Sequence, residues 1–103
     1  MAQVIVSPSA DADLEQILAH LGAHAGYRVA AKYNESFERL YGDLAHFPES
    51  GSPRPKLGTN IRIGVVFPYV VIYKRYEGDG VVRVLRIVHG ARRITGGMLR
   101  GLS

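Results

Sequence analysis

The last third of the chain contains the feature that most restricts its fold, an apolar stretch from Val81 to His89 interrupted by basic residues. β-Branched residues dominate this stretch, and a Gly-Asp-Gly turn sequence at 78–80 precedes it, as is typical of a strand entered through a tight turn. Just beyond it lie Arg92 and Arg93. Because a strand holds its residues rigidly and the following turn exposes them, this strand end is predicted to be a functional site.

Three other segments have the composition of strands. Ile61–Phe67 and Tyr69–Tyr76 are separated by a proline, and together with the last strand they predict a β-meander. Gln3–Ser7 is a short β-branched run at the N-terminus. The segment Pro48–Asn60 contains several prolines and glycines and has no periodicity, so it is predicted to be a loop.

The first half has helical periodicity. Ser7 is a suitable N-cap and Pro8 suits a first turn, so a helix is predicted to begin there and to end between Gly22 and Gly26. A second helix is predicted over Val29–Phe47, where apolar residues recur every three or four positions. The order β-α-α-β-β-β predicts an α+β fold, with a helical hairpin packed on a mainly antiparallel four-stranded sheet.

Length and composition limit the organisation of the protein. The 103 residues suit a single domain over 1–103, with an ordered core of about 2–93 and a glycine-containing tail, 94–103, that we expect to be frayed or to form a short helix. The absence of cysteine excludes disulfides and thiolate metal sites. No stretch has the length of a membrane span or the pattern of a secretion signal, so we expect a cytoplasmic protein without a membrane partner.

The charge is unevenly distributed. Lys and Arg number 13 against 9 Asp and Glu, and most acidic residues lie in the first half whereas most basic residues lie in the second. A basic surface of this kind suits RNA, DNA or an acidic protein, and charge alone does not choose between them. The plain alternative is a solvated face that keeps the protein soluble.

Several kinds of catalytic site lack their sequence pattern. His20 and His24 have the i, i+4 spacing of a helical metal pair, but neither the glutamate of an HExxH motif nor a third ligand accompanies them. The chain also lacks a serine nucleophile elbow and a phosphate-binding loop. We therefore expect no metal and no cofactor.

Basic residues and a histidine remain as candidates for binding a target: Arg62, Arg83, Arg86, His89, Arg92 and Arg93. Cleavage of RNA by its 2′-hydroxyl needs a proton acceptor, cations for the phosphorane charge and an acid for the leaving oxygen. Arg62, His89 and Arg92 are the residues that would supply these roles. In the alternative interpretation the arginines protect a small sheet and His89 only ends a strand.

Four segments also carry a resemblance to a known family. The chain reads SPSADADLEQI after the first strand, then FPESGSPRPKLGTNIR, PYVVIY and VVRVLRIVHGARR. In this order and spacing, from Val4 to about Arg93, it closely resembles the ParE branch of the RelE/ParE toxin superfamily. The resemblance implies a toxin of a bacterial type II toxin-antitoxin system, of the kind linked to plasmid stabilisation, held in a hetero-oligomer by a ParD-like antitoxin.

The resemblance implies two functions of different classes, because ParE-like members inhibit DNA gyrase whereas RelE-like members cut messenger RNA on the ribosome. Val70 stands where RelE-like nucleases have an arginine, and about Met98 stands where they have a C-terminal tyrosine, so both of these nuclease residues are missing. Only Arg62 and Arg92 match the other cations of those nucleases. We therefore expect a gyrase inhibitor. The alternatives are a ribosome-dependent mRNA endonuclease using basic residues and His89, and a degenerate, non-toxic relative that only binds an antitoxin.

The implied antitoxin has an expected position. A segment that folds on binding would lay a helix over the helical hairpin and add a strand to a free sheet edge. The residues expected to contact it are Leu18, Leu21, Tyr33, Phe37 and Arg75.

Overall fold

The computed structural model describes residues 1–90 and Leu99 of the chain. In chain order the elements are β1 (Gln3–Val6), α1 (Pro8–Ala25), α2 (Tyr27–His46), β2 (Ser52–Pro53), the 3-10 helix η1 (Pro55–Leu57), β3 (Ile61–Val66), β4 (Tyr69–Tyr76) and β5 (Val81–His89). One sheet has the strand order β1-β5-β4-β3-β2, in which β1 runs parallel to β5 and the other pairs are antiparallel. This α+β architecture confirms the predicted fold class.

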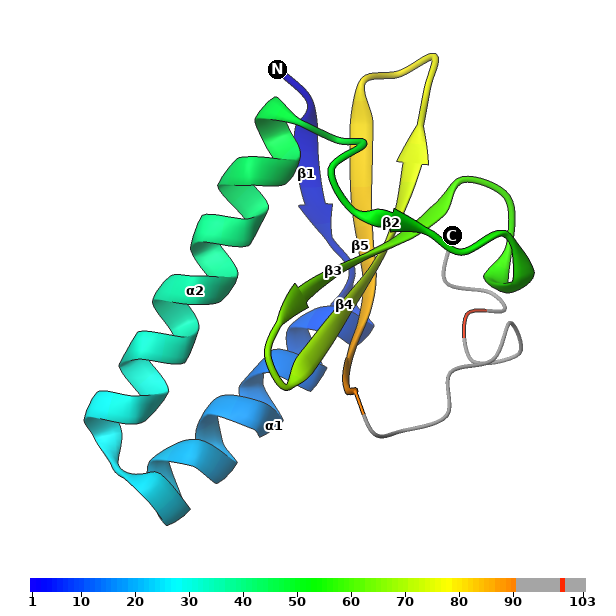
Figure 1. Ribbon diagram of the computed structural model, residues 1–103. Coiled ribbons are helices and arrows are strands. Elements are labelled where there is room, and N and C mark those ends of the chain that lie inside the picture. The colour runs from blue at the N-terminus through cyan, green and yellow to red at the C-terminus, as the bar shows by residue number, and fades with distance from the viewer. Residues whose placement is uncertain (91–98, 100–103) are drawn as a thin grey trace.

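The two helices form the predicted hairpin. Ser7 caps α1: its hydroxyl oxygen accepts a hydrogen bond from the Ala10 N–H at 3.1 Å and donates one to the Leu85 carbonyl at 3.0 Å, which ties the helix start to β5. Gly26, at φ +98°, separates the helices in a conformation that favours glycine. Figure 1 shows α2 running beside the sheet and the link between the helices lying away from the strands.

Apolar side chains cover both faces of the sheet. Phe37 and Leu44 of α2 are fully buried against a cluster that includes Val71 and Val84 from the central strands. On the opposite face a second cluster contains Ile61, Ile72, Leu85, Val88 and Leu99. Because the centre of the sheet is buried on both sides, its strands read as nearly continuous apolar runs.

A β-bulge interrupts the alternation of β5. Val84 pairs with Tyr73 and Arg86 pairs with Ile72, so Leu85 is an extra residue between two adjacent positions of β4. Before the bulge the even-numbered Val82 and Val84 contact the helix-side cluster, and after it the odd-numbered Ile87 does. The bulge thus shifts by one residue which side chains of β5 face the helices.

The segment predicted as a loop, Pro48–Asn60, also contains regular structure. Ser52 and Pro53 pair with Ile63 and Arg62 at the sheet edge, so the sheet has five strands instead of the predicted four. A two-residue strand that contains proline has no periodicity to detect, and it forms because the partner strand is present.

Two sequence predictions fall outside the part of the chain that the structure describes. Arg92 and Arg93 belong to the undescribed segments, as does the tail 94–103 apart from Leu99, which is 6% exposed. Within the described residues, neither helix is both long and apolar enough to cross a membrane.

Candidate functional surfaces

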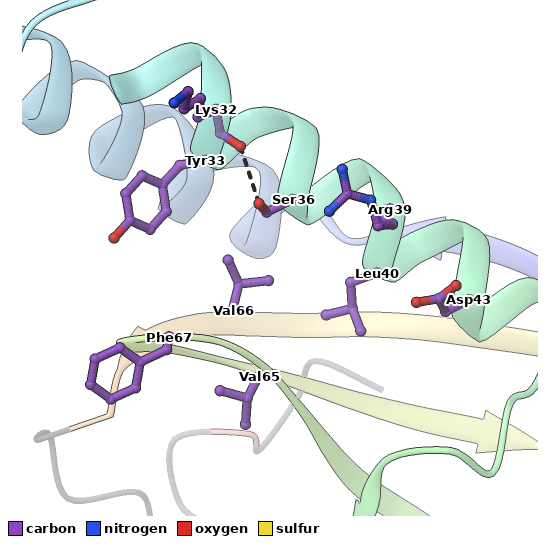
Figure 2. A pocket seen from close by; sticks show the side chains of 9 residues that line it. All are labelled: Lys32, Tyr33, Ser36, Arg39, Leu40, Asp43, Val65, Val66 and Phe67. Atoms are coloured by element: carbon purple, nitrogen blue, oxygen red, sulfur yellow. Dashed lines mark hydrogen bonds between the residues drawn. The ribbon is translucent and has the colours of Figure 1, made fainter. Parts of the chain in front are cut away.

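An exposed groove with apolar side chains at its edge lies between α2 and β3. It has a volume of about 430 Å³ and is lined by Lys32, Tyr33, Ser36, Arg39, Leu40, Asp43, Val65, Val66 and Phe67. Figure 2 shows the α2 side chains on one side of the groove and the end of β3 on the other. Val65 is 58% exposed and Phe67 is 84% exposed, so two large apolar side chains face solvent together at its edge. Adjacent exposed apolar residues of this kind are typical of a protein-binding surface.

Among the described residues, none pairs with the β3 backbone at the edge beside this groove beyond Ile63. The Ile61 carbonyl accepts a hydrogen bond from Arg54, and pairing with β2 ends at Ile63. In an antiparallel ladder every second residue faces the same neighbour, so the N–H and C=O of Val65 face this edge beyond the end of β2. The groove therefore has a short length of strand on which another chain can form main-chain hydrogen bonds.

Charged residues surround the groove. Lys32 and Arg39 on α2 are exposed, as is Asp43. None of the three forms an ion pair with another described residue. The surroundings of the groove are therefore net positive and suit an acidic partner.

His89 lies beside an aromatic group at the end of β5. Its ring contacts Tyr69 edge to face, with centroids 5.8 Å apart, and Tyr69 contacts Tyr33 in the same way at 5.8 Å and Phe37 at 6.0 Å. Burial, followed by the influence of Tyr33, raises the pKa of Tyr69 above its usual value. His89 is exposed, so the strand end predicted as a site does present its histidine at the surface.

Arg62 supports the loop before β3. Its guanidinium donates hydrogen bonds to the carbonyls of Glu49 at 2.9 Å and Gly51 at 2.7 Å. The neighbouring Tyr73 hydroxyl donates to the Pro48 carbonyl at 3.0 Å and accepts from the Gly51 N–H at 2.9 Å. Burial raises the pKa of Tyr73, and the hydrogen bond from Gly51 opposes that rise.

The structure does not bring Arg62 and His89 together. Arg62 pairs with Tyr73 on one side of β4 and His89 pairs with Tyr69 on the other, so they are four residues apart along that strand. That separation corresponds to roughly 13 Å along β4, in addition to the width of two strand spacings. A single phosphate group is too small to contact both residues in this conformation.

Arg86 forms an ion pair with α1 through two hydrogen bonds. It donates to both carboxylate oxygens of Asp13 on α1, at 2.7 and 3.1 Å, and Asp13 also accepts the Ile87 N–H at 2.9 Å. The hydrogen bond to Asp13 raises the pKa of Arg86 above its usual value. Asp13 thus joins α1 to β5 and satisfies a backbone N–H beyond the end of β1.

The residues expected to contact an antitoxin differ in accessibility. Tyr33 lines the groove, and Leu18 and Leu21 are half-buried on α1. Phe37 is fully buried and its ring contacts Tyr69. Arg75 forms ion pairs with Glu49 and Glu77, the second at 3.7 Å.

The described residues contain no group of three or more His, Cys, Asp and Glu side chains that could hold a metal ion. His20 and His24 are exposed on α1, with ring centroids 4.3 Å apart. Sequence reasoning missed the groove, although an exposed phenylalanine directly before the proline of a hairpin turn was a signal that could have indicated it.

Comparisons with known proteins agree with this fold. The family model described as "ParE toxin of type II toxin-antitoxin system, parDE" matches residues 4–94. Two relatives come from Caulobacter vibrioides: Toxin RelE2 is 37% identical over 89% of this chain and 99% of its own length, and Toxin ParE3 is 31% identical over 87% and 88%.

Two solved structures share the fold. The chromosomal ParDE toxin-antitoxin system from P. aeruginosa has a TM-score of 0.71 at 21% identity, covering 86% of this chain and 96% of that one. The toxin-antitoxin complex RelBE2 from Mycobacterium tuberculosis has a TM-score of 0.63 at 24% identity, covering 88% and 93%.

The fold and the matches together define the class of protein, a type II toxin of the ParE/RelE superfamily. Within that class, the chain belongs to the ParE toxin family. The resemblance seen in the sequence is thereby confirmed.

Proposed function

We propose that this toxin inhibits DNA gyrase in the cytoplasm and that a cognate ParD-like antitoxin neutralises it. The observation that carries the proposal is the incomplete and dispersed nuclease set. Val70 occupies the position of a nuclease arginine and packs against the apolar cluster on the face away from the helices. The Arg62 guanidinium already donates hydrogen bonds to two backbone carbonyls, and Arg62 lies far from His89.

Cleavage of mRNA on the ribosome is the second candidate function. It is favoured by the 37% identity to a relative named Toxin RelE2 and by the exposed position of His89 next to Tyr69. In this mechanism His89 would transfer a proton while basic residues stabilise the phosphorane charge.

Induced expression without an antitoxin separates these functions. Gyrase introduces negative supercoils, so its inhibition is expected to arrest growth and to relax a reporter plasmid while mRNA stays intact. Cleaved mRNA with normally supercoiled plasmid, abolished by His89→Ala, would overturn the gyrase proposal in favour of the nuclease. Normal growth with soluble, folded protein would overturn both.

The groove between α2 and β3 is the proposed antitoxin-binding surface. Exposed Val65 and Phe67 supply apolar area, the unpaired backbone of Val65 supplies a strand edge, and Lys32 and Arg39 supply positive charge. These features suit an extended antitoxin segment that has apolar residues and at least one acidic residue.

Phe67→Asp tests the groove, and Tyr27→Asp is its matched control, because Tyr27 is an aromatic residue of nearly equal exposure, 83%, at the hairpin tip. Burial of a phenylalanine side chain is worth about 2 kcal/mol, so Phe67→Asp should weaken antitoxin binding about 30-fold or more, as measured by calorimetry. Equal weakening by both variants, or by neither, would refute the proposed surface.

A further inference from the structure

The sheet carries a pair of cations on the face away from the helices, near the turn between β4 and β5. Lys74 and Arg83 are directly opposite each other in the antiparallel register. The neighbours of Arg83 along β5, Val82 and Val84, contact the helix-side cluster, so Arg83 points to the other face. We refer to Lys74 and Arg83 as the cation pair.

No acidic side chain of the described chain neutralises the cation pair. The ion pairs found there involve Arg75 and Arg86, and neither member of the cation pair takes part in one. The Arg83 Nε is buried and has no hydrogen-bond partner among the described residues. Like charges directly opposite on neighbouring strands destabilise a sheet, and an unpaired buried donor adds a further cost.

An aromatic side chain positions one of these cations. The Lys74 ammonium lies over the Tyr76 ring, 5.3 Å from its centroid, and Tyr76 is two residues further along β4 on the same face. This contact holds the ammonium close to the sheet.

We propose that the cation pair binds phosphate groups in the backbone of a nucleic-acid strand. Arginine and lysine on adjacent strands can share one phosphate or contact two neighbouring ones, and either arrangement relieves their mutual repulsion. Lys74, Tyr76 and Arg83 are half-buried, so each remains partly accessible to a ligand. Cations beside an aromatic ring on a sheet are typical of surfaces that bind single strands. The excess of basic residues in the chain favours a polyanion over an isolated carboxylate.

This site goes beyond the proposed function and does not depend on it. Arg83 and His89 are six residues apart on β5, roughly 20 Å along the strand, so the cation pair is separate from the strand end considered for RNA cleavage. The groove between α2 and β3 involves neither residue.

Fluorescence anisotropy with a labelled single-stranded oligonucleotide, measured over a series of salt concentrations, tests the proposal. Lys74→Gln and Arg83→Gln are each expected to reduce the slope of log affinity against log salt by about 1. The matched controls are Lys32→Gln and Arg39→Gln, each of which removes one positive charge from α2 and should leave the slope nearly unchanged. Thermal unfolding verifies that each variant is folded. Lys74→Gln alone is a sufficient test, because within the described part of the chain the only side-chain contact it removes is that with the Tyr76 ring.

Three results would overturn the proposal. The first is no binding of the oligonucleotide at low salt. The second is an equal loss of slope in the control variants, which would indicate general electrostatic attraction. The third is displacement of the labelled oligonucleotide by inorganic phosphate or by an acidic peptide at the same concentration as unlabelled oligonucleotide requires. That result would indicate a site for small anions or for a protein partner.

Discussion

Replacing Asp13 by alanine should destabilise the fold far more than a typical change on the exposed face of α1. The substitution removes three hydrogen bonds that join α1 to β5, and it leaves the Arg86 charge and the Ile87 N–H without their partner. Loss of a partner from a buried ion pair costs about 3–5 kcal/mol. Because the Arg86 and Asp13 side chains are 22% and 16% exposed, water replaces part of the interaction, and we expect about 3 kcal/mol.

The assay is urea or thermal unfolding followed by circular dichroism. A loss of about 3 kcal/mol lowers the melting temperature of a domain of this size by about 10–20 °C. Asp11→Ala is the matched control, since Asp11 is an exposed aspartate in the first turn of the same helix and loses mainly its interaction with the helix dipole, about 0.5 kcal/mol. Asp13→Asn should lie between the two, because it keeps an acceptor for the Ile87 N–H. An equal, small effect of Asp13→Ala and Asp11→Ala would refute the reasoning.

Three further predictions concern tyrosines and glycines. Tyr41→Phe should leave the free energy of unfolding unchanged or raise it slightly, because the buried Tyr41 hydroxyl has no hydrogen-bond partner among the described residues. Tyr73→Phe should lower that free energy by about 1–3 kcal/mol, because it removes two hydrogen bonds. Denaturant titration measures both. Burial, followed by the influence of Asp11, raises the pKa of Tyr41 to about 12. The folded state therefore keeps this proton when the unfolded state has lost it, so stability should fall between about pH 10 and 12, and less steeply in Tyr41→Phe. Gly51→Ala should destabilise the fold, since its Cβ would lie 2.5 Å from the Ile63 carbonyl oxygen. Gly42→Ala in α2 has open space around the new methyl group and should raise the free energy of unfolding by about 1 kcal/mol in the same titration.

Local sequence signals predicted the helices and the long strands well. The Ser7 cap, the glycine at position 26 and the end of β5 at His89 all lie where the sequence indicated. Each depends on a few neighbouring residues, through capping, a positive φ or strand composition. The strand β2 and the bulge at Leu85 were not predicted, because both are set by pairing with a strand distant in the sequence.

The site was less predictable for the same reason. Arg62 and Arg86 were selected by residue type, but their partners are 11 to 73 positions away along the chain, so no local pattern shows that their side chains are already hydrogen-bonded. By contrast, the lack of an acidic partner for Lys74 and Arg83 becomes visible only when the register of β4 and β5 is known. The exposed Phe67 likewise depends on where the turn places it.

Gyrase supercoiling of relaxed plasmid in the presence of the purified chain is the most direct test of the central claim. We expect the chain to inhibit supercoiling in a concentration-dependent way and added antitoxin to restore it. His89→Ala, which removes the candidate nuclease residue, should inhibit equally well. Undiminished supercoiling at saturating toxin, together with ribosome-dependent mRNA cleavage that His89→Ala abolishes, would contradict it.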